Sequence, residues 1–217
     1  MNWRILLTRP EPSNGIPAQV PALRSGAPML PRVLTGSLLA VVCAIWGLCG
    51  TQPVGAAPSP EHEIKAAFMY NFARFVQWPA GAFGQPQAPM ILCVLGEDAF
   101  GTAFDTIDRK AAQGHELQVR RHIRPEDVRS CHILFVAESE RARLGSIFRE
   151  VSGASILTVS DIDHFAEVGG VIGFYDLDNK VQFSINPEQA HDAMLQINSQ
   201  LMKLARIVGR SAREDGK

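Results

Sequence analysis

Three short, largely apolar runs constrain the fold of this chain more than any other feature. They are Met90–Leu95, Ile133–Val136 and residues 155–159. Runs of this length and composition are typical of strands with both faces buried, as in a parallel sheet covered by helices on its two sides. We therefore expect these three segments to form the middle of such a sheet.

The segments between these runs show helical spacing of apolar residues. Helices are predicted over residues 61–77, 100–108, 138–151 and, briefly, 162–167. Residues 116–123 alternate between apolar and polar side chains and indicate an edge strand. Two further strands, 171–175 and 181–185, flank a turn-forming segment and predict a hairpin. The pattern predicts a three-layer α/β sandwich with a mainly parallel central sheet and an antiparallel edge hairpin.

The first and last helices carry the clearest apolar faces. In the first, the apolar positions are Ile64, Ala67, Phe68, Phe72, Phe75 and Val76. The last is predicted as one long C-terminal helix, because Asn186 and Pro187 suit a helix start and Gly209 suits its end. Its predicted inner face comprises Ala190, Met194, Ile197, Leu201, Leu204, Ala205 and Val208.

The N-terminal 57 residues have the composition of an export signal. Arg32 precedes an apolar stretch over residues 33–48, and small residues follow at Ala56 and Ala57. We expect residues 1–57 to form an N-terminal extension with a cleaved signal peptide, with Met29 as an alternative start; an uncleaved membrane anchor is the other interpretation. A single domain over 58–209 and a polar tail over 210–217 complete the predicted organisation.

Charge argues against a nucleic-acid partner. The chain has a formal net charge of −1. Loss of residues 1–57 removes four arginines and one glutamate, which leaves −4 on the mature domain. A mildly acidic domain lacks the basic surface that phosphate backbones require, so no nucleic acid is expected. The sequence leaves the oligomeric state open, a homodimer included.

Two of the four cysteines, Cys93 and Cys131, lie in the mature domain. They sit at or beside consecutive core strands, and neighbouring strands are close enough for a disulfide. Export to an oxidising compartment favours a Cys93–Cys131 disulfide. Two buried free thiols are the alternative.

Motifs typical of catalysis are not found in the sequence. It has no phosphate loop, dinucleotide fingerprint, nucleophile elbow or zinc-protease helix. Asp161, Asp163 and His164 form the densest polar cluster, and a helix cap explains them better than acid–base or metal chemistry. No cofactor, metal or catalytic residue is therefore predicted.

A ligand, if there is one, is expected at the carboxyl ends of the parallel strands, where open α/β sheets bind small molecules. The candidate ligand-binding residues at these strand ends are Glu97, Asp98, Glu138, Ser139, Ser160 and Asp161.

Several motifs together resemble the YfiR family of periplasmic regulators. They are the segment from Glu63 to Pro79, Cys93 to Gly96, Cys131 to Phe135, Leu157 to Asp161, Gly169 to Phe174 and Ile197 to Ala205. The resemblance implies a binding protein that represses an inner-membrane diguanylate cyclase, controls cyclic di-GMP and biofilm formation, and is sequestered by an outer-membrane lipoprotein. It also implies that Cys93 and Cys131 match one of the two disulfides of the best-described member; the second has no counterpart here.

Three functions follow as hypotheses. The first is a periplasmic regulator that binds the periplasmic domain of a diguanylate cyclase. The second is a periplasmic small-molecule sensor that serves a membrane kinase or transporter, and the strand-end residues motivate it. The third, an enzyme that uses Asp161, Asp163 and His164, is the weakest of the three.

Overall fold

The computed structural model describes residues 59–209. The predicted signal peptide and the predicted polar tail lie outside these residues. The α-helices of the described part are α2 (Pro60–Phe75), α3 (Leu144–Val151), α4 (Pro187–Asp192) and α5 (Ser199–Met202). Short 3-10 helices cover Gly101–Thr106, Pro125–Ser130 and Glu138–Arg143.

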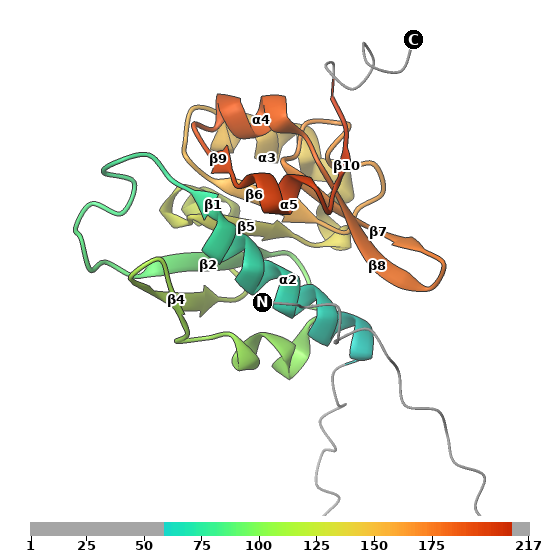
Figure 1. Cartoon of the computed structure of the whole chain (residues 1–217), viewed down its shortest axis with the longest axis horizontal. Coiled ribbons are helices and arrows are strands. Elements are labelled where there is room, and N and C mark those ends of the chain that lie inside the picture. The colour runs from blue at the N-terminus through green and yellow to red at the C-terminus, as the bar shows by residue number, and fades with distance from the viewer. Residues whose placement is uncertain (1–58, 210–217) are drawn as a thin grey trace, which may run out of the picture. The chain divides into compact units, whose positions relative to one another are not determined.

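A mixed sheet of eight strands forms the centre of the domain (Figure 1). Its strands, from one edge to the other, are β10 (Arg206–Ile207), β8 (Lys180–Ile185), β7 (Ile172–Leu177), β6 (Leu157–Ser160), β5 (Ile133–Val136), β2 (Met90–Leu95), β4 (His115–Arg120) and β3 (Ala111–Ala112). The five strands from β7 to β4 are mutually parallel, and β7 and β8 form the antiparallel hairpin. The mainly parallel sheet and the hairpin are confirmed, although two-residue β10 lies outside the hairpin.

The two faces of the sheet bury separate apolar clusters. In β2, Leu92 and Val94 face the cluster that contains α2, whereas Cys93 and Leu95 face the cluster that contains α3. Strand β5 divides in the same way, because successive side chains of a strand point to opposite faces. Helices thus cover both faces, as the continuous apolar runs predicted.

The prediction of one long C-terminal helix is wrong. Helix α4 ends at Asp192, and Met194 takes a left-handed backbone conformation with a φ of 57°. The chain then forms β9 (Gln196–Ile197), which pairs with β1 (Val76–Gln77) in a separate two-stranded sheet. Asn198 starts α5 by accepting a hydrogen bond from the Gln200 amide. Pairing with β1 and this cap outweigh the helical spacing of the apolar residues.

Other predicted helices are shorter than expected. The segment 100–108 contains only the 3-10 helix Gly101–Thr106, and 138–151 divides into a 3-10 helix followed by α3. Residues 162–167 form turns rather than a helix. The side chain of Phe165 in these turns is fully buried in the core.

Gly170 lies against that ring and has no room for a side chain. A Cβ atom at this position would lie 2.1 Å from Cε1 of Phe165 and 2.2 Å from Cδ1. We expect Gly170→Ala to lower the free energy of unfolding by about 2 kcal/mol, because overpacking a filled core forces its neighbours to move. Urea unfolding measures the change.

Gly145 provides the matched control, since a Cβ there meets nothing within 4 Å and the residue lies within α3. Gly145→Ala is expected to leave stability unchanged or to raise it by up to about 1 kcal/mol. Equal stabilities of the two variants would contradict the packing described for Gly170.

Candidate functional site

The strand ends predicted to bind a ligand do lie together. Leu95, Val136 and Ser160 are aligned across the neighbouring parallel strands β2, β5 and β6. The candidate residues Glu97, Asp98, Glu138, Ser139, Ser160 and Asp161 therefore follow one another along the carboxyl edge of the sheet.

Most of these side chains bind other parts of the protein. The Ser139 hydroxyl accepts a 2.9 Å hydrogen bond from the Glu97 amide. The Asp98 carboxylate accepts hydrogen bonds from the Phe100 amide and from the guanidinium of Arg121. These contacts close the loop after β2.

Glu138 and Ser160 are similarly engaged. Glu138 pairs with Arg141 at 2.9 Å. The buried Ser160 hydroxyl donates to the carbonyl of Val136 and accepts from the Ile162 amide. A ligand at the carboxyl edge stays a prediction, because such a ligand would have to compete with these internal partners.

Asp161 forms a long-range ion pair with the buried Lys65. The Lys65 ammonium lies 2.9 Å from Asp161 and 2.6 Å from Glu61. Burial alone would lower the pKa of Lys65, but the hydrogen bonds to Glu61 and Asp161 outweigh burial and raise it. The triad fastens the N-terminal half of α2 to the end of β6.

Asp163 and His164 do not join Asp161 in a catalytic arrangement. Asp163 is exposed and lies 3.8 Å from Arg141, while His164 approaches Glu167 at 3.9 Å. Within residues 59–209, no three His, Cys, Asp or Glu side chains are grouped as a metal site requires.

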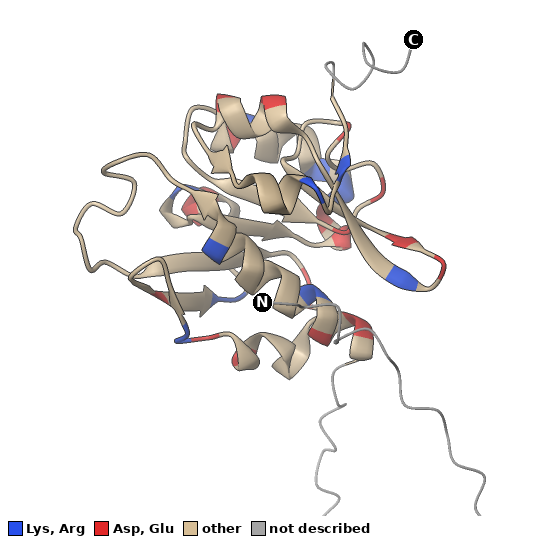
Figure 2. Cartoon of the chain, in the orientation of Figure 1, with Lys and Arg blue, Asp and Glu red and all other residues tan. Residues whose placement is uncertain are grey.

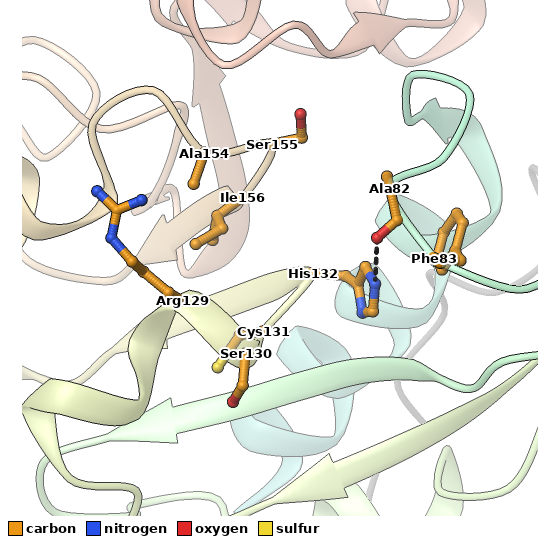
Figure 3. Close-up of a pocket in the computed structure, with 10 residues that line it drawn as sticks. Ala82, Phe83, Arg129, Ser130, Cys131, His132, Ala154, Ser155 and Ile156 are labelled. Atoms are coloured by element: carbon orange, nitrogen blue, oxygen red, sulfur yellow. Dashed lines mark hydrogen bonds between the residues drawn. The ribbon is translucent and has the colours of Figure 1, made fainter.

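A hollow of about 430 Å³ lies at the opposite, amino edge of the sheet. Three segments line it: 82–84 from the loop before β2, 129–132 before β5, and 154–156 before β6. Figure 3 shows Arg129 on one side of this amino-edge hollow and the Ala82–Phe83 loop on the other. The sequence reasoning missed this site because it considered only the carboxyl edge.

His132 holds the loop that forms one wall of the amino-edge hollow. Its Nδ1 accepts a 2.9 Å hydrogen bond from the Ile91 amide, and its Nε2 lies 3.3 Å from the carbonyl oxygen of Ala82 (Figure 3). A carbonyl can only accept, so Nε2 carries the proton and the imidazole is neutral. This geometry accounts for a histidine that had no role in the sequence analysis.

Phe83 lies between two imidazole rings. Its ring stacks on His115 with centroids 3.8 Å apart and on His132 with centroids 4.5 Å apart. His115 also contacts the carbonyl of Ala88 at 2.6 Å, and the Trp78 indole donates to the carbonyl of Ser155 at 3.1 Å. These contacts fasten the segment 78–89 across the starts of β5 and β6.

The environment of His132 disfavours its protonation. Burial lowers the pKa of His132 below the ordinary value of 6.5, the hydrogen bond to Ala82 opposes this effect, and His115 and Arg120 add to the lowering. Protonation at Nδ1 would also place a proton against the Ile91 amide. The folded protein therefore keeps the imidazole neutral.

We expect the protein to lose stability as the pH falls below 6.5. The unfolded chain takes up a proton at His132 at a higher pH than the folded protein does, so acidification favours unfolding. The contribution of His132 is fully present above 6.5 and is lost between that value and its lower folded pKa. Urea unfolding over a series of pH values measures it.

His132→Asn keeps a hydrogen-bond acceptor near the place of Nδ1 but does not titrate. The variant should show a weaker loss of stability on acidification than the wild type. Parallel pH curves for the two proteins would contradict the assignment to His132.

The two cysteines form a disulfide between their sulfur atoms. The Cα atoms of Cys93 and Cys131 lie 5.9 Å apart, and both side chains are buried in the cluster on the α3 side. Cys131 and His132 point to opposite faces, as expected for adjacent residues at a strand start. The disulfide therefore lies on the face of the sheet that α3 covers, and the contacts of His132 lie on the other face.

A family of known proteins matches most of the chain. A sequence model of the YfiR/HmsC-like family matches residues 62–206. A search of curated proteins finds no match. No helix within residues 59–209 has the length and apolar character needed to cross a membrane.

Two solved structures show partial similarity. A conserved domain protein from Vibrio cholerae is 10% identical, with a TM-score of 0.42 and 55% of each chain covered. An ABC domain in complex with L-Trp from Streptococcus pneumonia is 9% identical, with a TM-score of 0.41 and coverage of 54% of this chain and 56% of that chain. The chain thus spans about half the length of these proteins.

Proposed function

Because the chain belongs to the YfiR/HmsC-like family, we propose that it is a periplasmic regulatory protein that represses an inner-membrane diguanylate cyclase. The observation that carries this proposal is the family match, which extends over residues 62–206 and so includes nearly all of the described domain. The buried Cys93–Cys131 disulfide supports it, because such bonds persist in oxidising compartments outside the cytoplasm.

The mechanism is selective binding to one state of the cyclase. The protein binds the periplasmic domain of the cyclase when the enzyme is inactive, and its preference for that state shifts the equilibrium. Moving the cyclase from almost fully active to almost fully inactive takes a preference of about 10⁴-fold. No cofactor is needed for this function, and an outer-membrane lipoprotein that captures the repressor would relieve the inhibition.

Deletion of the gene tests the proposal. Cyclic di-GMP and biofilm formation should rise in the deletion strain and return to the original level when the exported protein is supplied again. A version that lacks residues 1–57 should fail to complement, since it cannot reach the periplasm. An unchanged cyclic di-GMP level after deletion would count against the proposal.

The amino-edge hollow favours a second candidate, a periplasmic small-molecule sensor that serves a membrane kinase or transporter. Its lining combines the Phe83 ring with the polar side chains of Arg129 and Ser155. A thermal-shift screen of metabolites against the exported protein tests this function. A strong shift for one compound that disappears in Arg129→Ala would support it, whereas no shift in the whole screen would oppose it.

A further inference from the structure

The two edges of the central sheet are closed to different degrees. At one edge, β3 pairs with the first residues of β4, and further hydrogen bonds occupy the rest of that strand. The Leu117 amide donates to the carbonyl of Lys110, and the Leu117 carbonyl accepts from the Arg109 amide. The Val119 amide donates to the Asp108 carboxylate at 2.9 Å. An incoming strand would have to displace these bonds, which protects the edge from unwanted pairing.

The opposite edge is open along most of β8. The last strand on that side, β10, pairs only with Ser184 and Ile185. Within residues 59–209, no strand pairs with the outer side of residues 180–183. Figure 1 shows the β7–β8 hairpin extending outward past the neighbouring elements. We call residues 180–183 the open edge.

The register of the hairpin shows which main-chain groups of β8 face outward. The Asn186 amide donates to the Val171 carbonyl, so the even-numbered residues of β8 bond to β7 and the odd-numbered ones point away from it. Val181 therefore directs its N–H and its C=O outward, at a position that β10 does not reach. The pairing of β7 with β8 is continuous from Ile172 to Leu177, so no bulge turns the open edge aside.

The charge beside the open edge is positive. Figure 2 shows basic residues in β8 and around β10. Lys180 begins β8, Lys203 lies just before β10, and within the described part of the chain neither ammonium has an ion-pair partner. Of the two acidic residues of the hairpin, Asp176 lies in β7, which β8 separates from the open edge, and Asp178 lies in the turn.

An edge of this kind fits an extended segment that adds a strand to the sheet. Main-chain hydrogen bonds then supply affinity, and the side chains supply specificity. Lys180 disfavours an apolar strand, because pairing would remove water from its ammonium, and it favours a strand with a carboxylate opposite it. A second copy, paired antiparallel through the same segment, would bring its own Lys180 onto the same face of the joined sheet, so like charges would oppose it.

We propose that the open edge of β8 is the docking site for an extended, acidic segment in the periplasmic domain of the cyclase, which adds a strand to the sheet. The inference rests on the proposed function for the identity of this partner. The main chain of the segment bonds to Val181, and its carboxylates lie beside Lys180 and Lys203. A segment that is extended only in the inactive cyclase would give the preference for one state that repression requires.

Val181→Pro tests the main-chain pairing. Proline removes the outward N–H, which pairing with β7 does not use, and edge strands tolerate proline. The probe is the full-length cyclase in nanodiscs, chosen as the cyclase whose own deletion cancels the rise in cyclic di-GMP. The variant, purified from the periplasm, should bind with a dissociation constant raised at least ~10-fold. Val181→Thr keeps the N–H and should bind within ~3-fold of the wild type, and urea unfolding checks the fold of both variants.

Two further measurements do not depend on proline. The double variant Lys180→Glu/Lys203→Glu changes only exposed positions and should raise the dissociation constant at least ~10-fold, because it places carboxylates against an acidic segment. Lys110→Glu, an exposed reversal beside the closed edge, should leave binding unchanged. In the complex, the Val181 amide should exchange with solvent at least ~10-fold more slowly than in the free protein, while the exchange of the Val119 amide should not change.

The outcomes separate this inference from the proposed function. If the wild type lowers cyclic di-GMP in the deletion strain and folded Val181→Pro lowers it equally, the docking site is wrong and the proposed function stands. An unchanged cyclic di-GMP level after deletion would remove both. Tight binding by the double lysine variant would also overturn the inference, as would a dimer of the free protein that Val181→Pro abolishes, since a second copy would then occupy the open edge.

Discussion

Loss of the Cys93–Cys131 disulfide should lower the free energy of unfolding by about 4 kcal/mol. The bond joins residues that are 38 positions apart in the sequence. In the chain-entropy model, closing a loop of that length removes conformations from the unfolded chain and leaves the folded protein unchanged. Since a domain of this size is typically stable by only 5–15 kcal/mol, this one bond is a large share of the total.

The location of the bond adds a second cost when it is removed by mutation. Cys93 is fully buried, Cys131 is 4% exposed, and both pack in the cluster that contains Ile147 and Phe165. Replacing both cysteines with alanine removes the cross-link and also leaves space where the sulfur atoms were. Reduction of the wild-type protein removes the cross-link alone, so the two treatments separate the contributions.

The experiment compares urea unfolding of the wild type with and without a reductant, and of Cys93→Ala/Cys131→Ala under the same conditions. Mass spectrometry after alkylation confirms the number of free thiols in each sample. The double alanine variant controls for the reductant, because its unfolding should not respond to it. Equal stability of the oxidised and fully reduced wild type would contradict the expected role of the bond.

The sheet could be predicted from the sequence because its strands carry their own signal. A run such as Met90–Leu95 is apolar on both faces, and no other common element of that length needs such a composition. The disulfide followed from the same signal, since Cys93 and Cys131 mark consecutive runs that become the neighbours β2 and β5. The sheet prediction depended on local composition and chain order alone, whereas the disulfide prediction also required export to an oxidising compartment.

Where two arrangements satisfy the same pattern, the sequence could not decide between them. In helix α2 the apolar positions predicted to face the core include Phe68 and Phe75, which are only half-buried, whereas Met69, outside the predicted set, is fully buried. The segment after α4 has the spacing of a helix, yet pairing with β1 and the left-handed Met194 break it. Tertiary contacts override local preference in both cases.

The amino-edge hollow could not be predicted from the sequence for a related reason. It is built from the loop 82–84 and the starts of two strands, which are joined by aromatic stacking between residues far apart in the sequence. His132 is conspicuous beside Cys131, but nothing in the sequence indicates that Phe83 lies on its ring. Only the fold places these residues together.

Replacing His132 with alanine should lower the free energy of unfolding by about 3 kcal/mol. The change leaves the amide of Ile91, a residue only 4% exposed, without its acceptor, and a buried unpaired donor costs about 1–3 kcal/mol. It also removes one of the two rings that stack on Phe83, a contact worth about 0.5–1.5 kcal/mol. Both losses act at the start of β2, so the loop 78–89 should loosen first.

Two variants separate these contributions. His132→Asn retains an acceptor for the Ile91 amide and loses only the ring, so it should be about 1 kcal/mol less stable than the wild type. His191→Ala removes an exposed histidine from α4 and should change stability by no more than about 0.5 kcal/mol. If His132→Ala were as stable as His191→Ala, the hydrogen bond from Ile91 would have no energetic role.

Trp78 is the single tryptophan of residues 59–209 and reports on the same loop. Trp3 and Trp46 lie within the predicted signal segment, which leaves Trp78, whose indole contacts the Ser155 carbonyl and the Phe83 ring. In His132→Ala, Trp78 emission should shift to longer wavelength before global unfolding, and the Ile91 amide should exchange faster with solvent. Because Phe83 stacks on both histidines, a loss at His132 weakens the whole wall of the amino-edge hollow, and any ligand of the hollow should bind this variant more weakly.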